Sequence, residues 1–193
     1  GLVTGFNVAC RAVGQENDAV MTATPAYPHF LSAPGNFRRK LVKVPLREEQ
    51  NRWGFDFDRL ESTVTPETRL FLLCNPHNPV GRVYTHDELK ALAGICEKHD
   101  IVICSDEIHC GLLLDNEKTH IPTATLAPEV AQRTITLMSP SKTFNLPGLG
   151  CAFAVISEEK LRRRFIAAMA GIVPRVNALG FTAAEAAYRE CSD

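Results

Sequence analysis

The sequence predicts an α/β fold of three layers, in which helices cover both faces of a mostly parallel sheet. Two observations favour this fold. Short runs rich in valine, isoleucine and leucine recur along the chain, and stretches with a helical pattern separate them. Each run has the length of a strand and is apolar almost throughout, which is typical of strands covered on both faces. Strands that alternate with helices imply right-handed crossovers, and therefore parallel pairing.

The elements are predicted in a regular order along the chain. Strands are expected from the apolar runs at residues 19–23, 40–44, 70–74, 101–105, 134–138 and 151–156. Helices are expected at residues 6–13, 28–33, 57–64, 87–99, 158–170 and from 177 to the end. The helix near Asp87 has the clearest signal, because its apolar residues share one face and Thr85 is placed to cap its start.

Composition and charge limit the classes of partner. The 193 residues are 45% apolar and 22% charged, an ordinary globular mixture that can bury a substantial core. The 21 basic and 22 acidic residues leave no net field to attract phosphate backbones or anionic lipid. We therefore expect no nucleic-acid partner and no membrane partner, and a small ligand instead.

The cysteines and the chain ends support two further expectations. Seven cysteines are present, and none forms a C-x-x-C pair of the kind that binds zinc or does redox chemistry. The sequence also has no signal peptide and no apolar run of membrane-spanning length, so we expect reduced cysteines in a cytosolic protein. We expect no metal site. The chain opens at Gly1 in an apolar run and stops at Ser192-Asp193 in an unfinished helical pattern, so we expect a fragment of a longer protein.

Polar residues gather where the predicted strands end. In an open α/β sheet, ligands bind beyond the carboxyl ends of the strands. Those positions hold Tyr27 after the first strand and, after later ones, the segments Asn75-Pro-His-Asn-Pro-Val-Gly81, Asp106-Glu-Ile-His109 and Ser139-Pro-Ser-Lys142. We therefore expect a single site at this edge of the sheet.

Lys142 is the candidate nucleophile of this site. A lysine that follows an apolar strand in a Ser-x-Ser-Lys-Thr context is expected to be partly desolvated, which lowers its pKa and favours Schiff-base chemistry. The alternative is a surface lysine whose stem packs on the domain while its amine stays in water.

Asp106 and Asn78 are the candidate cofactor-binding residues. Asp106 is carried to a buried strand end, where its charge needs a cationic partner such as a protonated pyridine nitrogen. The alternative is an aspartate that caps the next helix or pairs with an arginine. Asn78 lies in a turn made rigid by two prolines and a glycine, so its amide can donate to a phenolate oxygen; a plain surface turn is the alternative.

These residues resemble the fold-type-I pyridoxal-phosphate enzymes of the class I and II aminotransferase group. The resemblance runs from Gly1 to about Tyr188, and its most specific motifs occur in the same order as in the family. Those motifs are Asn75-Pro-His-Asn-Pro-Val-Gly, Ser105-Asp-Glu-Ile-His and Ser139-Pro-Ser-Lys-Thr-Phe-Asn-Leu. The resemblance implies the large domain of these enzymes and pyridoxal 5′-phosphate (PLP) as the cofactor.

The resemblance also implies a role for each candidate. Lys142 forms the Schiff base with PLP, Asp106 pairs with the pyridine nitrogen, and Asn78 bonds the phenolic oxygen. Tyr27 stacks on the pyridine ring. The phosphate is bound by the hydroxyls of Ser139 and Ser141 and by the backbone N–H groups of Gly1, Leu2 and Val3, a loop at a helix start.

Two departures from the common aminotransferases narrow the branch. Those enzymes place a tyrosine where His109 stands, and an arginine eight residues after the lysine, where this chain has Gly150. Asp-Glu-Ile-His, followed by His120-Ile-Pro122, looks most like the bacterial carbon–sulfur β-lyases of the cystathionine β-lyase type. His109 then donates to the phenolic oxygen as the tyrosine does, or else is a hydrogen-bonded packing residue.

The function implied is β-elimination from cystathionine or a cysteine-like amino acid, which gives pyruvate, ammonia and a thiol. An aminotransferase of the same group is the alternative, and a PLP-binding or regulatory fragment without catalysis is a second one. The family also implies a homodimer. Residues 1–176 then form the PLP-binding large domain, and residues 177–193 begin a helix that leads to a C-terminal small domain, where the arginine for the substrate carboxylate is expected.

Overall fold

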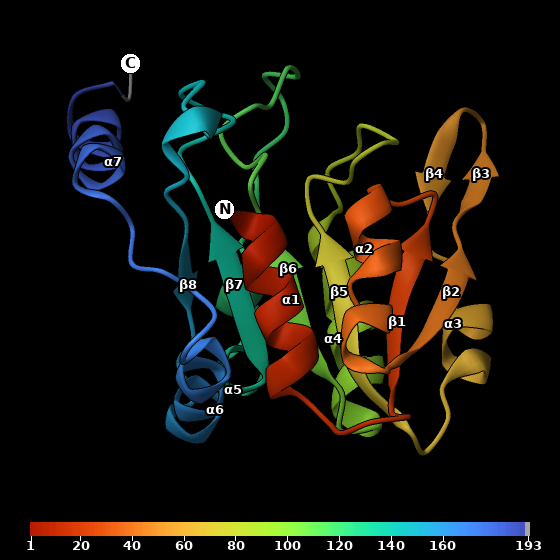
Figure 1. Cartoon of the computed structure of the whole chain (residues 1–193). Coiled ribbons are helices and arrows are strands. Elements are labelled where there is room, and N and C mark those ends of the chain that lie inside the picture. The colour runs from red at the N-terminus through yellow and green to blue at the C-terminus, as the bar shows by residue number, and fades with distance from the viewer. Residues whose placement is uncertain (192–193) are drawn as a thin grey trace.

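The structure, a computed structural model, describes residues 1–191 and consists of three layers (Figure 1). The central sheet has the strand order β2-β1-β5-β6-β7-β8, and every pairing is parallel except that of β7 with β8. Its strands are β1 (Ala19–Thr24), β2 (Lys40–Pro45), β5 (Thr68–Cys74), β6 (Val102–Asp106), β7 (Thr134–Met138) and β8 (Phe153–Val155). The predicted fold class is confirmed, because helices cover both faces of this mostly parallel sheet.

The helices divide between the two faces, and each set closes its own apolar core. Buried residues of α1 (Leu2–Ala12), α2 (Pro28–Ser32) and α6 (Glu159–Met169) form one cluster with the sheet. Buried residues of α3 (Phe57–Thr63), α4 (His86–Lys98) and α5 (Pro128–Gln132) form the other. Figure 1 shows α1 and α2 in front of the sheet and α4 behind it.

Helix α1 begins a turn earlier than the sequence predicts. The prediction placed its start at Phe6, whereas the helix begins at Leu2 with Gly1 as its N-cap. Leu2 and Phe6 stand four residues apart on one helical face, and both are buried in the core. The early start brings the first turn of α1 to the edge of the sheet where the parallel strands end (Figure 1).

The two edge strands are less covered than the sequence predicts. The expectation that all strands are covered on both faces is wrong for β2, where Val44 alone is buried, and for β8, where Phe153 and Val155 are exposed. An edge strand has a neighbour on one side only, and the two lysines of β2 keep its outer part in solvent.

A short hairpin and several single turns lie outside the prediction. Strands β3 (Arg47–Glu49) and β4 (Arg52–Gly54) pair antiparallel across a turn in which Gln50 and Asn51 both have positive φ. Their charged residues lack the apolar alternation by which strands are recognised. Three 3-10 turns, at Gly35–Phe37, Thr123–Thr125 and Pro147–Leu149, complete the connections.

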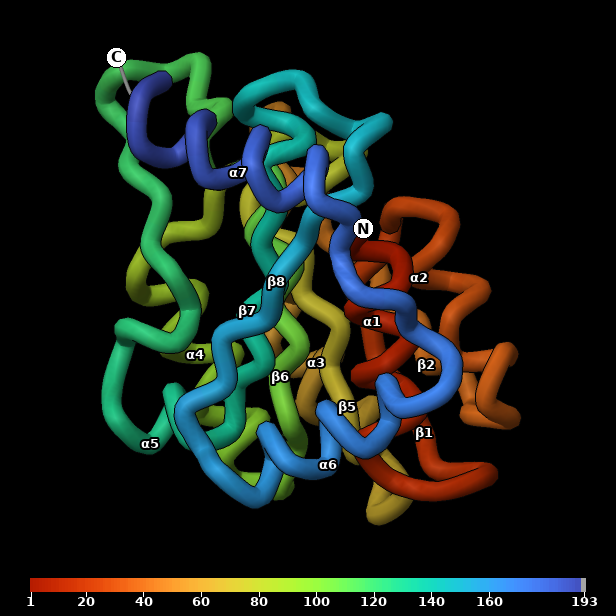
Figure 2. The backbone as a smooth tube through the Cα atoms, turned by 60° about the vertical axis from the view of Figure 1, so that its left-hand side comes forward, coloured from red at the N-terminus to blue at the C-terminus, as the bar shows by residue number. Residues whose placement is uncertain are grey.

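Helix α7 (Ala178–Glu190) is the last element described, and it lies beyond β8, outside the sheet (Figure 1 and Figure 2), with the Tyr188 ring 6.0 Å from that of Phe153 in β8. It was expected to run from residue 177 to the end of the chain, but residues 192–193 lie outside the described residues. Leu179 and Phe181 on this helix are exposed. Among residues 1–191, no helix combines the length and the apolar character needed to cross a membrane.

The capping of α4 by Thr85 is confirmed, and it supports a stability prediction. Thr85 Oγ1 accepts the N–H of Glu88 at 3.3 Å, and the Glu88 carboxylate accepts the N–H of Thr85 at 2.8 Å, so the capping box is complete. We expect Thr85→Ala to lower the free energy of unfolding by about 1 kcal/mol.

Urea unfolding measures this loss, with Thr119→Ala as the matched control. Thr119 is exposed, and its hydroxyl makes no hydrogen bond within residues 1–191. Equal midpoints for the two variants would show that the cap adds nothing to stability.

Candidate active site

All ten residues predicted for the site line one cavity of about 190 Å³ at the carboxyl edge of the sheet. They are Gly1, Leu2, Val3, Tyr27, Asn78, Asp106, His109, Ser139, Ser141 and Lys142. They come from five segments that are far apart in the sequence. The parallel sheet brings these segments together, because each one follows a strand or, for residues 1–3, begins the helix packed against the strand ends.

The strands deliver these segments in register. Cys74 at the end of β5 is the partner of Asp106 at the end of β6, and Asn75 N donates to Asp106 O at 3.0 Å. Glu107 N donates to Leu137 O of β7 at 3.0 Å. The backbone hydrogen bonds between neighbouring strands thus continue past the strand ends, and they hold the loops of β5, β6 and β7 close to one another.

Asp106 is a buried carboxyl without a cationic partner among residues 1–191. Its exposure is 5%, and its Oδ1 accepts the N–H of Ile108 at 3.1 Å. Burial, with a smaller contribution from the neighbouring Glu107, raises its pKa to about 7, although the Ile108 hydrogen bond acts in the opposite direction. The arginine pairing considered as an alternative is absent from the described chain, and the carboxyl faces a cavity that could admit a cation.

Lys142 is more exposed than the sequence predicts. It stands in the turn after β7, and the predicted partial desolvation is wrong, since the side chain is in contact with solvent. The physical reason is that the turn of residues 139–146 projects beyond the strand end, where the cavity opens. Lys142 nevertheless lines the same cavity as Asp106.

His109 stands between the cavity and a larger cleft. Half-burial lowers its pKa, and the nearby Lys142 lowers it further. Its ring makes no hydrogen bond within residues 1–191, so His109 is not a hydrogen-bonded packing residue in the described structure. A neutral imidazole with free nitrogens can donate to or accept from a ligand.

The two serines and the start of α1 form a corner rich in donors. Ser139 Oγ lies 2.9 Å from Ser141 Oγ and donates to Cys151 O at 2.6 Å. The first N–H groups of a helix have no intrahelical partner, so those of Leu2 and Val3 are available beside the serines. Leu2 and Val3 lie in the first turn of the helix rather than in a loop. Such a corner suits an anion.

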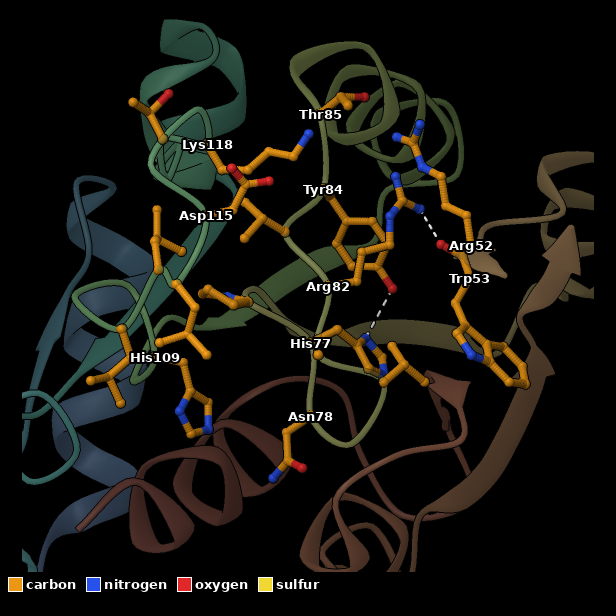
Figure 3. A pocket seen from close by; sticks show the side chains of 18 of the residues that line it. Arg52, Trp53, His77, Asn78, Arg82, Tyr84, Thr85, His109, Asp115 and Lys118 are labelled. Atoms are coloured by element: carbon orange, nitrogen blue, oxygen red, sulfur yellow. Dashed lines mark hydrogen bonds between the residues drawn. The ribbon is translucent and has the colours of Figure 1, made fainter. Parts of the chain in front are cut away.

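A larger open cleft of about 840 Å³ adjoins the cavity, and the two share Asn78 and His109 (Figure 3). The hairpin of β3 and β4 lines it at Arg52 and Trp53, and the loop after His109 lines it at residues 112–115, 117–119 and 121. No sequence pattern predicts this cleft, because the hairpin that forms one of its walls carries no strand pattern.

Sequence reasoning also missed a buried carboxylate that holds the loop of His109 in place. Glu107 is 1% exposed, and its Oε1 accepts from Ser105 Oγ and from Thr123 N, each at 2.9 Å. Its Oε2 lies 2.8 Å from His120 Nε2. The adjacent acidic pair Asp106-Glu107 was the available signal, since neighbouring residues of a strand end point to opposite faces.

The family model for aminotransferase class I and II matches residues 1–190. The chain belongs to this family. Cystathionine β-lyase PatB of Bacillus subtilis is 36% identical over 190 residues, which cover 97% of this chain and 49% of that protein. The chain thus spans about half the length of the curated relatives it matches. These relatives include further cystathionine β-lyases as well as kynurenine–oxoglutarate transaminases.

Solved structures agree with the family. The crystal structure of OvoB has a TM-score of 0.96 and 48% identity, and the match covers 99% of this chain and 50% of that one. Cystalysin from Treponema denticola, whose structure contains PLP, has a TM-score of 0.95 and 35% identity, with 99% of this chain and 49% of that chain covered. The predicted membership of this family of PLP-dependent lyases and aminotransferases is confirmed, and so is PLP as its cofactor.

Proposed function

We propose that this chain is the PLP-binding part of a carbon–sulfur β-lyase that acts on cystathionine or a cysteine-like amino acid. The observation that carries the proposal is the convergence of Lys142, Asp106 and Asn78 on one cavity, with His109 beside them. Relatives named cystathionine β-lyase, at 30% to 36% identity, support the lyase branch.

The cavity fits PLP by the chemistry of its walls. The buried Asp106 carboxyl, which has no cation of its own, offers a partner to a protonated pyridine nitrogen. Ser141 and the N–H groups at the start of α1 offer donors to a phosphate, and the Ser139 hydroxyl can offer another when it releases Cys151 O. Tyr27 offers a ring for stacking, and Asn78 and His109 offer donors to the phenolic oxygen.

The residues then divide the work of β-elimination. Bound PLP supplies an electron sink for charge that develops at the substrate α-carbon. Lys142 Nζ takes the α-proton, the bond from the β-carbon to sulfur breaks, and the sulfur leaves with its electron pair as a thiolate, which takes up a proton to become the thiol. Asp106 keeps the pyridine nitrogen protonated. Hydrolysis of the aminoacrylate that remains consumes water and releases pyruvate and ammonia.

Two other functions use the same residues. An aminotransferase would return the proton to the cofactor rather than expel the sulfur, and relatives named transaminases favour this as the second candidate. A PLP-binding or regulatory fragment without catalysis is a third candidate. The presence of both Lys142 and Asp106 at the cavity counts against it.

For the whole protein we propose a cytosolic homodimer with an amino-acid substrate. All seven cysteines are free among residues 1–191, which suits a reducing compartment. We further propose that residues 1–176 are the PLP-binding domain and that the helix from residue 177 leads toward a small domain. The coverage of about half of each relative supports this division.

We expect the whole protein, loaded with PLP, to release pyruvate and a thiol from cystathionine. Pyruvate is measured with lactate dehydrogenase, and the thiol with a thiol-reactive dye. A parallel reaction with a 2-oxo acid tests for amino transfer. Transfer without pyruvate would establish the aminotransferase, and PLP binding without either product would favour the fragment without catalysis.

A further inference from the structure

A buried hydrogen-bonded chain links the two loops that carry Tyr27 and Asn78. At its centre is His77, which is 3% exposed and directly precedes Asn78. His77 Nε2 lies 2.8 Å from Pro25 O, two residues before Tyr27, and His77 Nδ1 lies 2.9 Å from Tyr84 Oη. Figure 3 shows the Tyr84 hydroxyl pointing at the His77 ring, with Asn78 next to it.

The partners of the ring decide its tautomer. A proline carbonyl can only accept, so Nε2 of His77 carries the hydrogen and donates to Pro25 O. Nδ1 is then the acceptor for the Tyr84 hydroxyl. Burial lowers the pKa of His77 and raises the pKa of Tyr84, so the ring stays neutral and the hydroxyl stays a donor.

Tyr84 and His77 are each held by further contacts. Tyr84 is 1% exposed, stacks on Phe55 with ring centres 4.5 Å apart, and donates its backbone N–H to Asn75 Oδ1 at 3.1 Å. His77 closes its own turn, since its N–H donates to Arg82 O at 2.7 Å. The His77 ring is therefore held between Tyr84 Oη and Pro25 O.

We propose that His77, supported by Tyr84, is a positioning residue that sets Tyr27 and Asn78 relative to each other across the cofactor cavity. Tyr27 and Asn78 come from the loops after β1 and β5, and the His77–Pro25 hydrogen bond is a side-chain link between these loops. The inference rests on the proposed function, because it assigns His77 to the alignment of two PLP-facing groups. His77 itself does not touch the cofactor cavity.

The test compares His77→Phe, which keeps a ring without hydrogen bonds, with His77→Gln, which can still donate to Pro25 O. We expect His77→Phe to weaken PLP binding about tenfold and to diminish the visible circular dichroism of the bound cofactor, because its ring is held less asymmetrically. His77→Gln should keep the PLP affinity and the circular dichroism of the bound cofactor close to those of the wild type. His99→Gln is the matched control, since His99 bonds Glu61 at the far end of α4.

A measurement on cofactor-free protein tests this inference separately from the proposed function. Hydrogen–deuterium exchange of the peptide containing residues 24–30 should be faster in His77→Phe than in the wild type. Faster exchange in a protein that does not bind PLP would leave the link standing and refute the proposed function. Unchanged exchange, PLP affinity and circular dichroism in a folded His77→Phe would overturn the inference.

If His77→Phe does not fold, Tyr84→Phe decides, because it removes one hydroxyl from the same chain of bonds. We expect it to raise exchange in residues 24–30 and to weaken PLP binding about threefold. A folded Tyr84→Phe with wild-type values for both would equally overturn the inference.

Discussion

Replacing Lys142 with alanine is expected to abolish the covalent link between PLP and the protein while leaving the fold intact. Lys142 is exposed in the turn after β7, and its side chain makes no hydrogen bond or ion pair within residues 1–191, so the side chain adds little to packing. We expect the free energy of unfolding to change by less than about 0.5 kcal/mol. Turnover of cystathionine should fall to background, because the proposed base is gone.

Borohydride reduction followed by mass spectrometry measures the link directly. Wild-type protein should gain one reduced PLP on the peptide that contains Lys142, and Lys142→Ala should gain none. Lys160→Ala, an exposed lysine on α6, is the matched control and should retain the link. A reducible link that persists in Lys142→Ala would show that another lysine bears the cofactor.

Asp106→Asn is expected to lower turnover by at least about a hundredfold while PLP still binds. The amide keeps the shape of the carboxyl, but it cannot hold a proton on the pyridine nitrogen, and the electron sink is weakened. Steady-state kinetics beside a PLP titration measure the two effects separately. Turnover within about threefold of the wild type would show that Asp106 only caps the turn at Ile108.

The same substitution is expected to stabilise the protein without cofactor at high pH. The Asp106 pKa is about 7 in the folded chain and near 3.8 in the unfolded one, so between these values the folded state binds more protons. Stability of the wild type therefore falls as pH rises through this window, by on the order of a few kcal/mol, and the variant lacks this loss.

Urea unfolding of cofactor-free protein at pH 4 and at pH 8 measures the difference. Asp106→Asn should gain stability over the wild type at pH 8 and little at pH 4. The buried carboxyl would then be a group kept for function at a cost in stability. A difference between the two proteins that does not change with pH would show that Asp106 ionises without penalty.

The parallel sheet and its site followed from the sequence because their signals are local. Apolar runs such as residues 134–138 mark buried strands, and Thr85 marks the start of a helix by its own side chain. Since parallel strands end at one edge, the residues that follow them meet there, and the predicted residues Lys142, Asp106 and Asn78 do line one cavity.

Other features depended on contacts between distant residues, which no local pattern reports. Whether β2 and β8 are covered depends on their place at the edges of the sheet, and the exposure of Lys142 depends on how far its turn projects beyond β7. The bond from His77 to Pro25 joins residues 52 positions apart. The sequence by itself therefore determined the order of strands and helices, the chemical groups at the strand ends and the burial of Asp106. Tertiary packing decided the exposure of Lys142 and of the edge strands, the charge state of Asp106 and the bonds that hold these groups.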